Sequence, residues 1–144
     1  MNDRQYSAKT WLSEAWRIKK TELQIREEHA EKLKPDDGAM QYDKDRVQND
    51  SSTLQEERLL SWTMAMQEVD NIKTKIVKIQ RTRLAAINLL QDSDERSLLI
   101  ARYLQFNEWK SICRKLGYSR TELHRRHMKA LDNIFPLIKE VDDE

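Results

Sequence analysis

Apolar residues recur every three or four positions along most of the chain, which is the pattern of amphipathic helices. The first such stretch covers residues 7–33 and begins at Ser7, a residue type that favours helix N-termini. Two of its apolar residues are the large aromatic side chains Trp11 and Trp16, which need a partner surface. The other apolar positions are Leu12, Ala15, Ile18, Leu23, Ala30 and Leu33. The pattern therefore predicts an N-terminal helix with one apolar face.

A polar connector is predicted at about residues 34–52. Pro35 and Gly38 end the first helix, because proline cannot continue a helix and glycine allows a sharp turn. Within the connector, Tyr42 and Val47 are the main apolar anchors. Connectors of this length are uncommon inside one compact domain, so we expect it to separate two helices.

A long central helix is predicted to begin near Ser52 or Thr53, since both residues fit capping boxes with Gln55 and Glu56. Its apolar stripe steps by three and four as in a coiled coil, and shifts phase at Arg83. We favour a helical hairpin in which the first helix covers this stripe; the alternative is a homodimer through the same stripe. The stripe consists of Leu59, Trp62, Met66, Val69, Ile72, Ile76 and Ile79, followed by Leu84, Ile87 and Leu90.

A third helix is predicted at about 93–105, where Asp92 and Glu95 have the spacing of a capping box. Two shorter elements follow at about 108–115 and 119–134. The last of these should stop at Pro136, because proline cannot continue a helix. Residues 137–144 would then form an acidic tail.

The two elements after residue 107 have the layout of a helix-turn-helix, a common way to present a helix to the DNA major groove. Gly117 lies where the chain must turn sharply, and a glycine can adopt positive φ there. Ser119 and Glu122 form a predicted capping box for the second helix. The first helix has an inward apolar stripe, and Leu123, Met128 or Ala130, Leu131 and Ile134 anchor the second. That stripe consists of Trp109, Ile112, Cys113 and Leu116.

Composition supports an all-α fold, since the 144 residues include only 2 Gly and 2 Pro. We expect residues 1–91 to form the hairpin or coiled-coil region and residues 92–136 to form the helix-turn-helix domain. The lone Cys113 excludes an internal disulfide, and no segment has the pattern of a signal peptide or membrane span. These features favour a cytoplasmic protein. The sequence contains no phosphate loop, metal-ligand set or catalytic triad, so we expect neither an enzyme nor a cofactor.

Charge is unevenly distributed although the formal net charge is only +1. The balance is −4 over residues 1–70, +8 over residues 71–135 and −3 over the remainder. A basic segment between acidic ones indicates a localised surface for a polyanion, although solvated helix faces would give the same count. The basic run between Lys73 and Arg83 could contact phosphates, but we favour plain solvation or pairing with acids of the first helix. Those acids include Glu22, Glu27, Glu28 and Glu31.

The candidate DNA-contacting residues follow from their places in the helix-turn-helix. N-terminal residues of the second helix reach base edges in such motifs, and arginine can form two hydrogen bonds with guanine. The predicted base-reading residues are therefore Arg120, Thr121, His124 and Arg125. Basic residues around them are predicted to contact phosphates. These residues are Lys110, Arg114, Lys115, Arg126, His127 and Lys129.

The stretch "RYLQFNEWKSICRKLGYSRTELHRRHMKALDNI" resembles the fourth region of bacterial sigma factors, which reads the −35 promoter element. The shared features are an Ile-Cys/Ala pair, Leu-Gly-x-Ser at the turn and a closing Ala-Leu-x-x-Ile. The whole chain is similar to phage late-gene transcription regulators of the ArpU/RinA type. The resemblance implies a transcription activator for promoter DNA in a bacterial host cell. In such an activator the long helical region would either dimerise or contact the host RNA polymerase. Arg126 departs from the sigma pattern, which is usually apolar there.

Two other functions fit the same residues. One is a protein-interaction module that mimics a sigma factor and binds RNA polymerase or a host regulator without DNA. The other is a small phage DNA-packaging subunit, although its helix-turn-helix would normally be N-terminal. Base reading by Arg120 and Arg125 would distinguish a DNA-binding protein from the sigma mimic. A ring-sized mass would indicate the packaging subunit. No membrane or small-molecule substrate is expected.

Overall fold

The computed structural model describes residues 1–35 and 49–142, without the side chains of residues 49–52. Within these ranges the chain is helical apart from short joints and contains no strand, so the predicted all-α fold is confirmed. No helix in the described ranges is long and apolar enough to cross a membrane. The predictions for Gly38, Tyr42, Val47 and the Ser52 side chain lie outside the described residues.

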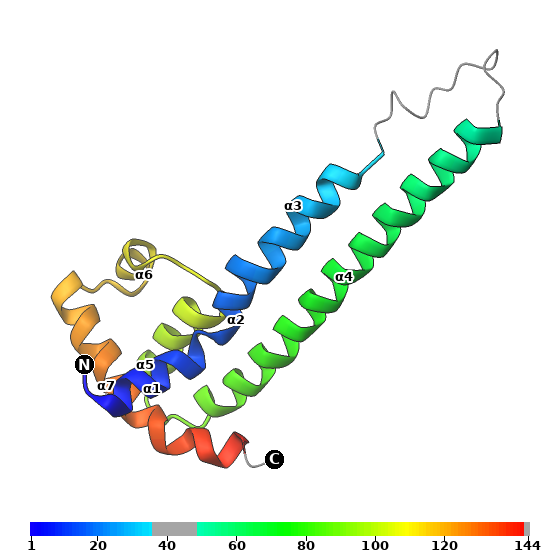
Figure 1. Cartoon of the computed structure of the whole chain (residues 1–144). Coiled ribbons are helices and arrows are strands. Elements are labelled where there is room, and N and C mark those ends of the chain that lie inside the picture. The colour runs from blue at the N-terminus through cyan, green and yellow to red at the C-terminus, as the bar shows by residue number, and fades with distance from the viewer. Residues whose placement is uncertain (36–48, 143–144) are drawn as a thin grey trace. The chain divides into compact units, whose positions relative to one another are not determined.

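The helices divide between two compact units, one of Met1–Ile18 with Ile76–Glu144 and one of Lys19–Lys75. Two elements, η1 and η3, are single π-helical turns, which occur mostly as short interruptions of α-helices. Figure 1 shows the helices by label and colour. In chain order the elements are α1 (Asp3–Leu12), α2 (Glu14–Ile18), η1 (Lys19–Leu23), α3 (Gln24–Leu33), α4 (Asn49–Ile87), α5 (Ser93–Leu99), η3 (Ile100–Leu104), α6 (Trp109–Leu116) and α7 (Arg120–Asp142).

The N-terminal helix begins earlier than the sequence indicated. Asn2 accepts a hydrogen bond from the Gln5 backbone N–H at 2.8 Å, and the Gln5 side chain accepts one from the Asn2 backbone at 3.1 Å. This reciprocal pair is a capping box and satisfies two N–H groups at the helix start. Ser7 lies inside α1, so its predicted capping role is wrong.

The Lys19–Lys75 unit contains the predicted hairpin. Ion pairs connect its two helical segments: Arg26 lies 2.7 Å from Glu68, and Lys75 lies 3.9 Å from Glu22. Val69 of the central helix is 1% exposed. The other buried apolar residues of this unit are Leu23, Ala30 and Ala65. The central helix starts at Asn49, three residues before the predicted Ser52, so the connector is shorter than predicted.

Part of the predicted apolar stripe of α4 stays uncovered in this unit. Leu59 is 46% exposed and Met66 is 36% exposed, whereas Val69 on the same helix is buried. The first helix therefore covers only one side of the stripe. The outer side remains open to a partner.

The other unit has one hydrophobic core that joins the two ends of the chain. Ala8 and Leu12 of α1 are fully buried in it, together with residues of α5, α6 and α7. The Gln5 side chain donates to the Asp132 carboxylate at 2.8 Å and to the Met128 carbonyl at 3.3 Å. Residues 1–18 thus pack with the C-terminal helices, whereas the sequence grouped them with residues up to 91.

The last helix continues past Pro136, where the sequence predicted its end. Proline removes one backbone hydrogen bond from a helix interior. Burial offsets that loss, because Leu137, Ile138 and Val141 pack against the core. Asp142 also accepts a hydrogen bond from the indole N–H of Trp11 at 3.3 Å. Residues 137–142 are therefore helical and do not form the predicted tail.

Candidate nucleic-acid interface

Helices α6 and α7 are joined by a tight turn at Gly117, as expected for the predicted helix-turn-helix. This glycine has φ 73°, in the left-handed region that other residues adopt only at a cost. The backbone N–H groups of Gly117 and Tyr118 both donate to the Cys113 carbonyl, at 2.9 and 3.1 Å. The bond from Gly117 is that of an αL C-cap, and the bond from Tyr118 is the outer bond of a Schellman motif, so both help to close the end of α6. The predicted turn is confirmed at the predicted residue.

Ser119 caps α7 as predicted, but Glu122 has a different role. The Ser119 hydroxyl accepts a hydrogen bond from the Glu122 backbone N–H at 3.2 Å. The Glu122 carboxylate does not return to Ser119; it accepts hydrogen bonds from Arg125 and Arg126. The predicted capping box is therefore only half formed, because the Glu122 carboxylate bonds to two arginines and not to the Ser119 backbone.

The inward faces of both helices are fixed by the core. Ile112 of α6 is fully buried, and Leu123 of α7 is 3% exposed. Further along α7 the buried anchors are Ala130, Leu131 and Ile134, all with 0% exposure. The orientation of α7 about its own axis follows from this stripe, so the residues on its opposite face must point to solvent.

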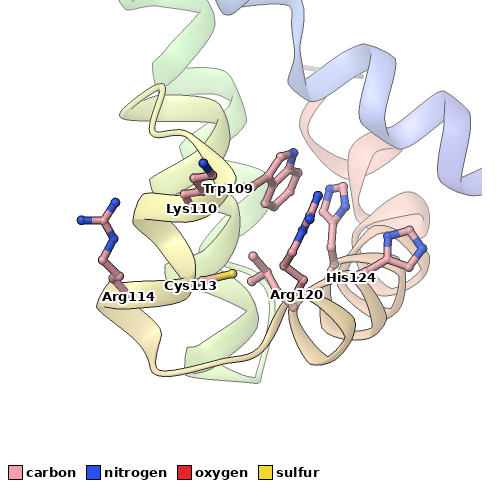
Figure 2. A pocket seen from close by; sticks show the side chains of 8 residues that line it. Trp109, Lys110, Cys113, Arg114, Arg120 and His124 are labelled. Carbon is pink, nitrogen blue, oxygen red and sulfur yellow. The ribbon is translucent and has the colours of Figure 1, made fainter.

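A hollow of about 400 Å³ lies between α6 and the first turns of α7. Trp109, Cys113 and Leu123 contribute apolar surface, and Lys110, Arg114 and Arg120 contribute positive charge (Figure 2). Cys113 and Arg120 point into the space between the helices, and Arg114 projects outward at its edge. None of the eight lining residues is acidic. The lining is completed by His124 and His127.

The structure brings together five of the ten predicted DNA-contacting residues at this hollow. Arg120 and His124 of α7 and Lys110 and Arg114 of α6 are exposed and contribute to its lining. The remaining exposed members of the predicted set do not line it. These are Lys115 on α6 and Thr121, Arg125 and Lys129 on α7.

Arg126 is half-buried, and its side chain is held by contacts within the unit. Its side chain donates to Glu122 at 2.9 Å, lies 3.6 Å from the Asp94 carboxylate and covers the Tyr118 ring at 4.4 Å from the centroid. Asp94 belongs to α5, so Arg126 ties the start of α7 to a second helix. Its predicted role as a phosphate contact is not favoured by this geometry.

His127 is buried, so its predicted contact with phosphate is wrong. It is 4% exposed, its Nε2 lies 2.6 Å from the Tyr103 hydroxyl, and its ring lies 4.7 Å from that of Trp109. Burial raises the pKa of Tyr103 above its ordinary value, so the tyrosine stays protonated at neutral pH. Spacing could have revealed this, since His127 lies four residues after Leu123 and four before Leu131.

Protonation of His127 is expected to destabilise the folded protein. Burial lowers the pKa of His127 to about 3, whereas an unfolded histidine has a pKa of about 6.5. Between these values the unfolded chain binds more protons, so stability is present at neutral pH and falls as the pH falls through about 6.5. We expect the free energy of unfolding to be about 2 kcal/mol lower at pH 5 than at pH 7.5.

Urea unfolding at a series of pH values measures this dependence. His127→Gln removes the titrating group and keeps the other two histidines, so it controls for their protonation. The variant should show a much flatter profile between pH 7.5 and 5. An equally steep decline in the variant would assign the effect to other groups. Among the described residues, no group of three His, Cys, Asp or Glu is suited to a metal ion.

Comparison with known families finds one family model that matches most of the chain. Residues 38–134, which include α6 and most of α7, match the family model described as "Protein of unknown function (DUF1492)". The chain belongs to this family. No curated protein and no solved structure matches the chain. Membership in the family therefore leaves the function to be argued from the geometry of α6 and α7.

Proposed function

We propose that this protein binds DNA sequence-specifically and activates transcription, with α7 placed in the major groove. The observation that carries the proposal is the hollow between α6 and α7, which has a cationic rim and no acidic lining residue. The rim joins residues of both helices of the motif: Lys110 and Arg114 from α6, and Arg120 from α7. A helix-turn-helix presents such a combined surface to the duplex.

Base reading is assigned to the exposed side chains in the first two turns of α7. Arg120 and Arg125 can each form two hydrogen bonds with the O6 and N7 atoms of guanine. Thr121 can contact a base edge or a thymine methyl group, and His124 can donate or accept a hydrogen bond. All four side chains lie at the exposed start of the helix. This is the part of a recognition helix that reaches base edges.

Phosphate contacts are assigned to the exposed lysines and arginines beside the reading residues. Lys110, Arg114 and Lys115 lie on α6, and Lys129 lies further along α7. Such contacts set the position of a protein on the duplex and carry no sequence information by themselves. Arg126 and His127 are omitted from this set, because one is held by Glu122 and Asp94 and the other is buried.

The regulated genes are proposed to be late genes of a phage or prophage, as the resemblance to ArpU/RinA regulators suggests. A single helix-turn-helix buries little surface, so pairing of two copies or contact with RNA polymerase would strengthen binding. The half-exposed Leu59 and Met66 of α4 offer a surface for either contact. A sigma mimic that binds polymerase without DNA is the competing function.

The salt dependence of binding to duplex DNA tests this proposal. Four proposed phosphate contacts should give a slope of log affinity against log salt of about −3 to −4. Lys110→Ala with Arg114→Ala should make this slope less negative by about two units. Lys32→Ala with Lys139→Ala removes the same charge from exposed positions outside the proposed surface and is the matched control. Absence of binding at low salt would favour the sigma mimic. An unchanged slope in the first variant would place the phosphate contacts on another surface.

A further inference from the structure

Glu122 holds the side chain of Arg125 in a defined orientation on the exposed start of α7. The Arg125 Nε donates to Glu122 Oε2 at 3.1 Å, and Arg125 Nη2 donates to Glu122 Oε1 at 2.6 Å. Two parallel hydrogen bonds fix the plane of the guanidinium as well as its position. Arg125 is thus ordered before any ligand binds, although its side chain is 63% exposed.

The hydrogen bonds to Glu122 leave the outer edge of Arg125 available. A guanidinium has five N–H donors, and this carboxylate uses one on Nε and one on Nη2. The three donors that remain are on the two terminal nitrogens. Arginine uses this same edge to contact the O6 and N7 atoms of guanine. The ion pair and guanine recognition are therefore compatible.

Glu122 is itself fixed by the body of the unit. Arg126 donates to Glu122 Oε1 at 2.9 Å, and Arg126 is held by the Tyr118 ring and by Asp94 of α5. Hydrogen bonds from Arg125 and Arg126 lower the pKa of Glu122 to about 2, so the carboxylate is ionised at neutral pH. A continuous chain of contacts thus runs from α5 to Arg125.

We propose that Glu122 is a positioning residue for base recognition, which orients Arg125 to select a guanine in the DNA site. This inference rests on the proposed function of α6 and α7 in reading DNA. A free arginine loses side-chain entropy when it binds, and a side chain that is already held loses less. The contact with guanine then becomes stronger relative to the contacts with other bases.

Loss of Glu122 should change specific and non-specific binding in opposite directions. The carboxylate repels phosphates, so Glu122→Ala should raise the affinity for random duplex about two- to threefold at moderate salt. The same variant should lower the preference for guanine at one base pair about tenfold, because Arg125 is no longer oriented. A purely structural role of Glu122 would weaken both kinds of binding together.

The experiment compares affinities for a selected DNA site, for its single-base variants and for random duplex. The proteins are the full-length chain and its Glu122→Ala, Glu122→Gln and Arg125→Ala variants, with Glu140→Ala as a control that removes an exposed acid from the same helix. Arg125→Ala identifies the base pair that Arg125 reads. We expect Glu122→Ala to lose preference at that base pair, and Glu122→Gln to keep part of it through its amide oxygen.

Three results would overturn the inference. Each of them contradicts a different claim: the role of Glu122, the role of Arg125 or the proposed function. Retention of the guanine preference in both Glu122 variants, with its loss in Arg125→Ala, contradicts the positioning role alone. Retention in Arg125→Ala contradicts Arg125 as the reading residue. No sequence preference in the unmodified protein contradicts the proposed function itself. Circular dichroism of each variant separates these results from unfolding, and Glu122→Gln keeps the test valid if Glu122→Ala does not fold.

Discussion

Replacing Arg120 and Arg125 together by alanine is expected to remove specific DNA binding while the fold survives. Each bidentate contact with guanine contributes about 1–3 kcal/mol, so the affinity for the selected site should fall by about 2–6 kcal/mol. Both side chains are exposed, and the ion pair between Arg125 and Glu122 is a surface pair within one helix. Its loss should leave the free energy of unfolding almost unchanged, because exposed ion pairs contribute little to stability.

Gel-shift titration of the selected site and of a scrambled site measures this effect. The double variant Lys32→Ala with Lys139→Ala again serves as the control, because it changes the net charge equally at exposed positions. The control should retain discrimination between the two sites. Discrimination that persists in the Arg120 and Arg125 variant would assign base reading to a different surface.

The second large effect is the loss of folding stability expected when a buried leucine of α7 is replaced by alanine. Leu131 of α7 is fully buried in the core. Leu131→Ala should therefore lower the free energy of unfolding by about 2–5 kcal/mol, since it removes apolar contacts and leaves a cavity. Leu89→Ala is the matched control, because the same substitution at a side chain that is 47% exposed should cost less than about 1 kcal/mol.

Urea unfolding monitored by circular dichroism distinguishes these two leucine variants. The folded fraction of Leu131→Ala should still prefer the selected site, because none of the proposed reading residues is changed. This outcome separates a stability effect from a recognition effect. Equal losses of stability in the two variants would mean that Leu131 is not part of the core.

The sequence was sufficient to predict α6, α7 and the turn between them, because the signals for these elements are local. The turn needs a residue that tolerates positive φ, and Gly117 has φ 73°. The second helix needs a capping oxygen, and Ser119 provides it 3.2 Å from the Glu122 N–H. The inward stripe of α7 follows directly from apolar spacing. None of these three features depends on a distant part of the chain.

Features set by distant residues were not predicted. His127 is buried because Tyr103 and Trp109, from other elements, surround it. The first 18 residues pack with the C-terminal helices through contacts such as Gln5 with Asp132, which lies far along the chain. Pro136 is accommodated inside α7 because apolar residues beyond it pack on the core. In each case tertiary packing outweighs a local preference.

The charge network at the start of α7 was only partly visible in the sequence. Spacing of three and four residues allows Glu122 to pair with Arg125 and Arg126, but the same residue also fits a capping box. The structure shows that the carboxylate bonds to the arginines. Asp94 and Tyr118 decide the outcome, because they hold Arg126 in place from outside the helix.

Selection of bound DNA from a random pool tests the central claim most directly, namely that the α6–α7 unit reads sequence. Parallel selections should use the unmodified chain and the variant with alanine at positions 120 and 125. The account predicts a short enriched motif containing guanine for the unmodified chain and no enriched motif for the variant. No enrichment with the unmodified chain, or the same motif with both proteins, would contradict the account.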